Sequence, residues 1–175
     1  MNDTKEQIRS THFPEFSKQE VWKILGQVTD PEVPVLTVTD LGIIRDVKIN
    51  DDEIEVIITP TYTGCPAMDM IAANIRIALL MNGFKKVKIT SVLSPAWTTD
   101  WMSETGKEKL KAYGIAPPAA LNRIEKLLFE EESKIICPQC NSVNTKLISQ
   151  FGSTACKALY QCNDCKEPFD YFKCH

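Results

Sequence analysis

The sequence has only two histidines, no apolar run long enough to cross a membrane, and no region with a strong excess of basic residues. The histidines are His12 and His175, close to the two ends of the sequence. A nucleophilic cysteine ordinarily needs an adjacent base, so the lack of a central histidine disfavours a cysteine hydrolase. A transmembrane helix needs about 20 predominantly apolar residues, so no membrane-spanning segment is predicted.

The first 20 residues lack the apolar core of a signal peptide and instead carry charged side chains such as Lys5, Glu6 and Arg9. We therefore expect the protein to be cytoplasmic. Because the cytoplasm is reducing, structural disulfides are not expected there. The seven cysteines therefore point to metal binding or redox chemistry.

Charge is distributed unevenly but weakly along the chain. The net charge is -3, with -5 in residues 1–133 and +2 in residues 134–175. Neither part is basic enough to predict a nucleic-acid interface. The length of 175 residues allows one ordinary domain with its own core and one small module that needs an additional constraint, such as a metal.

Residues 59–68 contain one reactive side chain, Cys65, between a strand-like run and an apolar helical pattern over residues 67–81. Pro66 suits the first helical position, which puts Cys65 at or next to the N-cap. The unpaired N–H groups of a helix start favour a thiolate. The alternative, that Cys65 is a small buried apolar residue like most free cysteines, stays open.

The first two thirds of the sequence predict a small α/β (α+β) domain with a mixed sheet, over residues 17–116. A capping box at Ser17 and Glu20 starts the first helix. A hairpin, a helix and a strand parallel to the hairpin follow, since strand–helix–strand units usually leave their strands parallel. The expected elements are a hairpin over 43–59, a helix over 67–81, a strand over 87–93 and a short helix over 103–113. Residues 1–16 are expected to form a loose arm, and residues 117–133 a connecting helix.

Two loops carry candidate functional side chains. Asp30, Glu32 and Asp40 lie in a segment with two prolines that we interpret as an ordered functional loop, although loop carboxylates commonly cap turns instead. Trp97 and Trp101 lie in a polar loop after the third strand. They either cover the core or form a partner-binding surface, since aromatic residues dominate binding hot spots.

The last 42 residues contain two C-x-x-C pairs, formed by Cys137 with Cys140 and by Cys162 with Cys165. Four thiolates at this spacing can surround one metal ion tetrahedrally and so stabilise a short segment. With short strands expected over 145–151, 157–161 and 168–172, this pattern predicts a zinc ribbon over residues 134–175. Iron is the alternative metal, because a rubredoxin-type site uses the same four ligands.

Cys156 and Cys174 are left over from the two pairs. They are candidates for auxiliary thiols in ligand exchange or cluster handling, or for ordinary packing, and the pattern does not choose among these roles.

Residues 17–116 resemble the iron-sulfur-assembly domain family that includes SufT-like proteins. The resemblance is carried by the run from Asp30 to Pro34, by Asp40-Leu41-Gly42, and by the run from Thr59 to Pro66. With residues 94–101, 151–158 and 167–174 added, the whole chain is similar to a family of accessory proteins of the phenylacetyl-CoA epoxidase system in phenylacetate degradation.

This resemblance implies a non-enzymatic factor that assists iron–sulfur cluster assembly, with the epoxidase components, especially the iron–sulfur reductase, as partners. It implies a transient cluster handled by these residues: Cys65, Asp30, Glu32, Asp40 and Thr63. One cysteine cannot hold a cluster alone, so we expect a shared site in a homodimer or complex, or help from an auxiliary thiol. The alternative is a non-catalytic docking subunit of the oxygenase with a zinc ribbon.

Overall fold

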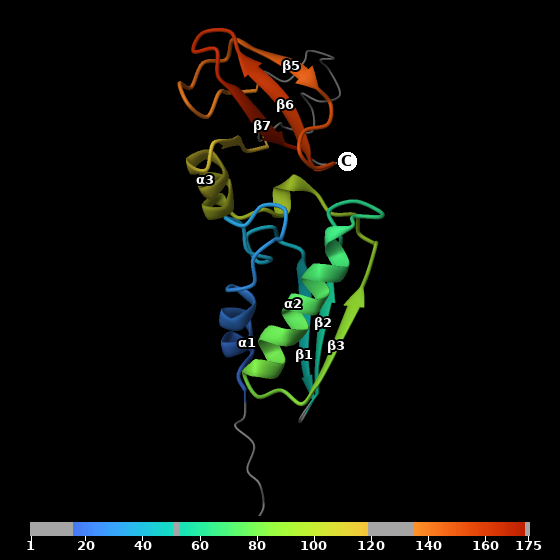
Figure 1. The fold of residues 1–175 in the computed structure, drawn as a ribbon. Helices are drawn as coiled ribbons and strands as arrows, with labels where there is room; N and C mark the ends of the chain where they lie inside the picture. The colour runs from blue at the N-terminus through green and yellow to red at the C-terminus, as the bar shows by residue number, and fades with distance from the viewer. Residues whose placement is uncertain (1–15, 51–52, 119–134, 174–175) are drawn as a thin grey trace, which may run out of the picture.

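The structure is a computed structural model that describes residues 16–50, 53–118 and 135–173 (Figure 1). Residues 1–15 of the expected arm, residues 119–133 of the expected connecting helix, and Cys174 lie outside the described residues. The chain forms two separate sheets, one in each part of the chain, which follow one another along the long direction of the molecule (Figure 1). In the part of the chain that is described, no helix has the length and apolarity that crossing a membrane requires.

The first helix, α1 (Lys18–Leu25), begins at the predicted capping box. The backbone N–H of Glu20 donates to the Ser17 hydroxyl at 3.2 Å, and the backbone N–H of Ser17 donates to the Glu20 carboxylate at 2.8 Å. These reciprocal bonds satisfy backbone donors that have no partner inside the helix. The ring of Phe16, directly before the capping box, stacks on Phe84 with ring centroids 4.3 Å apart. The helix start is thereby fixed to the turn after α2.

The first sheet has the order β1 (Ile44–Asn50), β2 (Glu53–Ile58) and β3 (Lys86–Ser91). Strands β1 and β2 are antiparallel, and β3 is parallel to β2 after the crossover helix α2 (Ala67–Met81). The predicted hairpin and parallel strand are confirmed. Both α1 and α2 cover one face of this sheet (Figure 1). The hairpin residues that pack into the core are Val47, Ile54, Val56 and Ile58, which are buried, and Ile49, which is partly buried.

The loop between α1 and β1 is part of the core, because Leu36, Val38 and Leu41 are all buried. Gly42, at the end of this loop, has a φ of +66° and lies against the backbone of Trp101. A Cβ atom at Gly42 would lie 2.1 Å from the Trp101 carbonyl oxygen, which is well inside van der Waals contact. Only glycine fits this position.

We therefore expect Gly42→Ala to lower the free energy of unfolding by about 3 kcal/mol, the upper end for a strained backbone position. Gly64→Ala is the matched control, since Gly64 also has a positive φ, +82°, but nothing lies within 4 Å of the added Cβ. In that control the free energy of unfolding should fall only by the strain of placing alanine in the left-handed conformation, about 1–2 kcal/mol. Urea unfolding measures both, and equal losses would mean that the Trp101 contact is not limiting.

The second sheet has the order β4 (Ile115–Ala116), β7 (Pro168–Phe172), β6 (Lys157–Cys162) and β5 (Thr145–Ser149). The predicted ribbon strands are confirmed, and β5–β6 and β6–β7 are antiparallel. Strand β4 was not predicted. It follows α3 (Glu104–Ala112), the predicted short helix, and pairs in parallel with β7.

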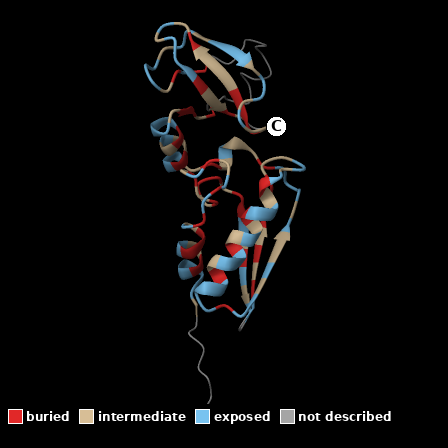
Figure 2. Cartoon of the chain, in the orientation of Figure 1, coloured by how far each residue is buried: buried red, intermediate tan, exposed pale blue. Residues whose placement is uncertain are grey.

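The two modules share buried contacts. Ala116, at the expected end of the first module, belongs to the ribbon core, whereas Cys156 and Phe172 of the ribbon belong to the core of the first module. The rings of Trp97 and Phe172 meet edge to face, with centroids 6.5 Å apart. Figure 2 shows buried residues in both modules and in the segments between them. The expected division at residue 116 stays a prediction, and the residues beside it form an interface.

Candidate functional site

The four cysteines of the two C-x-x-C pairs come together in the ribbon. Their sulfur atoms all lie within 4.8 Å of one another. The Sγ atoms of Cys137 and Cys165 are 3.8 Å apart, and those of Cys140 and Cys162 are 3.6 Å apart. A tetrahedral ion with metal–sulfur bonds of about 2.3 Å has sulfur–sulfur edges of about 3.8 Å, so the set fits such an ion. The four thiols therefore form a metal site.

The backbone around these cysteines is shaped for metal binding. Asn141 and Lys166, each directly after the second cysteine of a pair, have φ values of 60° and 68°. Both residues have the left-handed backbone conformation, which turns the chain directly after each pair of ligands. Burial raises the pKa of Cys162, but backbone hydrogen bonds from Cys165 and Asp164 and side-chain hydrogen bonds with neighbouring cysteines lower it to about 7. The thiolate form, which is the metal ligand, is thereby favoured at Cys162, whereas the pKa values of Cys140 and Cys165 are raised, with hydrogen bonds from neighbouring cysteines among the causes.

Asp164 joins the two turns of the metal site. Its carboxylate accepts hydrogen bonds from the Ser142 hydroxyl and, at 2.9 Å, from the Asn144 side-chain amide. The side-chain amide of Asn163 donates in turn to the Asn144 side-chain carbonyl at 2.9 Å. These bonds cross from one C-x-x-C turn to the other and so hold the ligands in register.

Cys65 lies in the turn between β2 and α2 and is partly buried. Helix α2 starts at Ala67, with Pro66 as its N-cap and no side-chain capping bond. The helix spans the predicted residues 67–81, with Pro66 as its N-cap rather than its first helical residue, so Cys65 is next to the N-cap as expected. The N–H of Met68 donates to the Cys65 carbonyl at 3.3 Å, and the N–H of Cys65 donates to the Tyr62 carbonyl at 3.3 Å. Consecutive tight turns thus fix the backbone on both sides of the thiol.

The Tyr62 phenol is hydrogen-bonded to the Cys65 side chain. Burial raises the pKa of Tyr62 to about 12, helped by the charge of Cys65 and a hydrogen bond with it, and by the charges of Glu32 and Cys156. All three groups are therefore close to one phenol, which stays protonated at neutral pH. Tyr62 was not predicted as a site residue, although it lies in the motif that contains Cys65.

Cys156 reaches this region from the ribbon, directly before β6. Its thiol donates to the Glu32 carboxylate at 3.4 Å and is 3.0 Å from the Thr154 hydroxyl. Burial raises the pKa of Cys156 to about 11, and the hydrogen bond to Glu32 adds to the rise. Of the candidate site residues, the structure therefore brings Glu32 and Cys156 into contact, whereas Cys65 is hydrogen-bonded to Tyr62.

Asp30 holds the Glu32 loop in shape. Its carboxylate accepts hydrogen bonds from the backbone N–H groups of Glu32 and Val33, at 2.8 and 2.7 Å. Burial raises the pKa of Asp30 despite these bonds and the nearby Lys157. Lys157 is itself buried, 3.9 Å from the Asp170 carboxylate. Asp30 thus caps the turn that presents Glu32 to Cys156, which is a positioning role.

Asp40 is used by the fold rather than by the thiol site. It accepts hydrogen bonds from the Thr37 and Ser103 hydroxyls at 2.8 and 3.0 Å and pairs with Lys109 at 2.6 Å. Burial raises the pKa of Asp40, but these partners outweigh burial and lower it. The carboxylate ties the loop before β1 to helix α3, and its bonding capacity is largely taken.

The two loop tryptophans differ. Trp97 is only 4% exposed, and its indole N–H donates to the Leu41 carbonyl at 2.8 Å. Of the two alternatives that the sequence leaves open, Trp97 therefore covers the core, because a partner cannot use a side chain that packs inside the molecule. Trp101 is partly exposed, with the Arg45 guanidinium 3.6 Å from its ring centroid. A partner contact at Trp101 remains a proposal.

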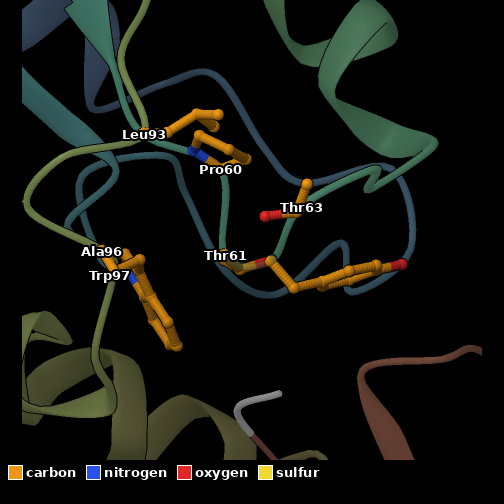
Figure 3. A pocket seen from close by; sticks show the side chains of 7 residues that line it. Pro60, Thr61, Thr63, Leu93, Ala96 and Trp97 are labelled. Atoms are coloured by element: carbon orange, nitrogen blue, oxygen red, sulfur yellow. The ribbon is translucent and has the colours of Figure 1, made fainter.

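Thr63 is exposed and lines a small pocket between the turn before α2 and the loop after β3 (Figure 3). The pocket is lined by Pro60, Thr61, Tyr62, Thr63, Leu93, Ala96 and Trp97. It opens beside the Cys65 turn, so Thr63 lies at the edge of the thiol site.

Comparison with known proteins follows the two modules. Residues 18–91 match the family described as iron-sulfur cluster assembly protein, and residues 123–173 match the PaaD zinc beta ribbon domain. A protein of Escherichia coli K12, named as a subunit of 1,2-phenylacetyl-CoA epoxidase, is 51% identical over 155 residues, which cover 89% of this chain and 92% of that protein. The chain belongs to the PaaD family.

Other relatives match the first module of this PaaD-family chain. An Fe-S protein maturation auxiliary factor of Porphyromonas gingivalis is 38% identical over 90 residues, covering 50% of this chain and 85% of that protein. A crystal structure of a DUF59 domain from Bacillus anthracis superposes with a TM-score of 0.50 at 25% identity, covering 53% of this chain and 89% of that chain. The ribbon is thus an addition to a domain that also occurs alone.

Proposed function

We propose that this PaaD-family protein is a non-catalytic accessory factor that helps mature the iron–sulfur reductase component of the phenylacetyl-CoA epoxidase system in aerobic phenylacetate degradation. The proposal is supported by the name of the Escherichia coli relative and by the match to the iron-sulfur assembly family. It is also supported by relatives named as Fe-S protein maturation factors. We place this activity in the cytoplasm, where the reductase would receive its cluster.

The observation that carries the proposal is the placement of Cys65. Its thiol is partly buried beside Tyr62, in a turn with tight backbone bonds on both sides, and next to the N-terminus of a 15-residue helix. A soft thiolate in such a place can take iron from a donor and release it to a client. The described residues provide no histidine base for hydrolysis, so a ligand role suits this cysteine better than a nucleophilic one.

In this proposal the ribbon has a structural role, with zinc as its metal. The four sulfur atoms surround one position completely, and a closed four-ligand site is typical of structural zinc. The ribbon presents Cys156 to the first module and completes the interface around Phe172. Metal analysis of anaerobically purified protein should find one zinc per chain and no colour from iron.

Cys65→Ser is expected to leave folding and ribbon metal intact and to abolish maturation. Pro66 rather than Cys65 is the N-cap of α2 and has no side-chain capping bond, so serine at position 65 removes no helix cap. A serine hydroxyl cannot supply a soft thiolate to iron at neutral pH. The variant should be expressed with the epoxidase components in cells that lack the natural protein. Cluster content and electron-transfer activity of the reductase should fall to the level seen without the protein.

Cys174→Ser removes a different thiol by the same chemical change, and normal cluster loading with it would assign the loss seen with Cys65→Ser to Cys65 itself. Normal loading with Cys65→Ser would refute the maturation role. The protein would then be better described as a docking subunit, and its co-purification with the oxygenase components would be the next measurement.

A further inference from the structure

Helix α2 has an exposed apolar side opposite the side that packs on the sheet. The buried residues of α2 are Ala67, Ile71, Ile75 and Leu79. The exposed apolar residues, which we call the α2 stripe, are Met70, Ala73, Ile77 and Leu80. They recur at alternating steps of three and four residues, so they form one line along the helix. Figure 2 shows exposed residues recurring along α2.

The α2 stripe is more exposed than a soluble helix usually leaves its apolar residues. Met70, Ile77 and Leu80 are 55%, 54% and 44% exposed. A helix that is apolar on two opposite sides is typically covered on both. A continuous exposed apolar patch usually marks a surface that binds another molecule. We therefore looked for a feature beside the stripe that identifies its partner.

Two oppositely charged side chains, Asp69 and Arg76, lie beside the stripe. Both are exposed and are seven positions apart, so they lie on the same edge of the stripe, separated by about 10 Å along the helix axis. In the described part of the chain, neither side chain has a hydrogen bond or an ion pair. The separation is too long for the two to pair within one helix, so each charge is available to a partner.

We propose that the α2 stripe packs against the α2 stripe of a second copy of this chain, with the two helices antiparallel. Around a two-fold axis beside Ala73, Asp69 of each copy faces Arg76 of the other, so one contact forms two ion pairs. A parallel pair would place like charges opposite each other and form neither. The small side chain of Ala73 at the crossing point lets the helices approach closely. This self-complementary charge is the feature that favours a second copy over a different protein.

The antiparallel contact keeps the two Cys65 thiols apart. Cys65 precedes the helix, and the two copies run in opposite directions from the axis beside Ala73. At a rise of 1.5 Å per residue, the two thiols are about 20 Å apart. Each copy therefore has its own Cys65 site, rather than one site shared across the dimer. The contact itself does not depend on the maturation role.

Sedimentation velocity of the full chain, with its ribbon metal in place, tests the contact from micromolar to millimolar concentration. A contact made by one helix is smaller than the roughly 800 Å² per partner of a standard interface, so a weak monomer–dimer equilibrium is expected. Ile77→Glu places a charge in the stripe and should leave only monomer. Leu147→Glu is the matched control, because Leu147 is 46% exposed on β5 of the ribbon, and this variant should dimerise as the wild type does.

Exchanging the charges tests the antiparallel register. Asp69→Arg and Arg76→Asp each turn two opposite-charge pairs into two like-charge pairs, so each variant alone should dimerise at least about tenfold more weakly. An equal mixture of the two variants restores both pairs between unlike copies, so it should dimerise about as well as the wild type. A folding defect in one variant could not be rescued by mixing, and circular dichroism should show both folded.

Three results would overturn the proposal. A wild type that stays monomeric at millimolar concentration would leave the stripe to a different protein. Dimerisation that persists in Ile77→Glu, or is lost in Leu147→Glu, would place the contact outside α2. A mixture of the two charge variants that stays monomeric would mean that Asp69 does not face Arg76 of the other copy.

Discussion

Replacing Cys162 with serine is expected to release the ribbon metal and to unfold most of residues 135–173. The ribbon core has five buried residues, and two of them are metal ligands: Ala116, Ile135, Cys137, Cys162 and Phe169. So small an apolar core cannot hold the segment without the ion. Metal binding in zinc-finger peptides contributes about 10–16 kcal/mol, and most of that contribution would be lost.

Loss of the ribbon metal should also lower the stability of the first module. Phe172 and Cys156 of the ribbon are buried in the first core, and β4 pairs with β7. Unfolding of the ribbon would therefore uncover Trp97 and weaken the module that contains it. We expect a lower midpoint for the remaining unfolding transition, but a folded first module.

Metal analysis, circular dichroism and urea unfolding measure these effects. Cys156→Ser is the matched control, since it changes a ribbon cysteine that is outside the metal set and should retain one metal per chain. A Cys162→Ser protein that keeps its metal and a single unfolding transition would contradict the assigned role of the ribbon ion.

The parts of the fold that could be predicted from sequence have local signals. The bonds at Ser17 and Glu20 span three residues, and the β1–β2 hairpin joins neighbouring segments. The strand–helix–strand order predicts that β3 is parallel to β2, because a helical crossover is the usual connection between parallel strands. The two C-x-x-C pairs share one short module, so their spacing was enough to predict one metal site.

The rest depends on contacts between distant residues. Glu32 and Cys156 are 124 positions apart, and no local pattern indicates that they meet. Strand β4 has two residues and pairs with a strand more than 50 positions later, so its sequence resembles a linker. Asp40 was grouped with Asp30 and Glu32 because of its charge, yet it bonds with α3 instead. A loop carboxylate takes its role from whichever element packs against it.

Trp97 shows the same limit, since its polar neighbours in sequence suggest a surface loop. The partner of its indole N–H is the carbonyl of Leu41, 56 positions earlier, and its ring meets Phe172 of the ribbon. Both contacts are invisible in the sequence around it. A side chain in a polar loop can therefore be a core residue when a distant element closes over it.

Trp97→Ala is expected to lower the free energy of unfolding by about 3–5 kcal/mol, the usual cost of removing a large buried aromatic side chain. The Leu41 carbonyl would also lose its indole donor in a buried place. Trp97→Phe separates the contribution of the buried ring from that of the hydrogen bond, because phenylalanine refills much of the cavity but leaves the Leu41 carbonyl without a donor. We expect this variant to lower the free energy of unfolding by about 1–3 kcal/mol. Urea unfolding of each variant gives these differences, provided that the dependence of the free energy of unfolding on urea concentration is the same in all variants.

Trp101→Ala is the matched control for a partly exposed tryptophan of the same loop. It removes a cation–π contact with Arg45, which is worth about 0.5–1 kcal/mol at an exposed site. We therefore expect Trp97→Ala to destabilise the protein several times more than Trp101→Ala. Equal and small decreases in the free energy of unfolding for both variants would mean that Trp97 is a surface residue that a partner can contact. A large decrease in the free energy of unfolding for Trp97→Ala alone would mean that this side chain helps to join the two modules. Its indole ring would then stabilise the position of the ribbon relative to the turn that contains Cys65.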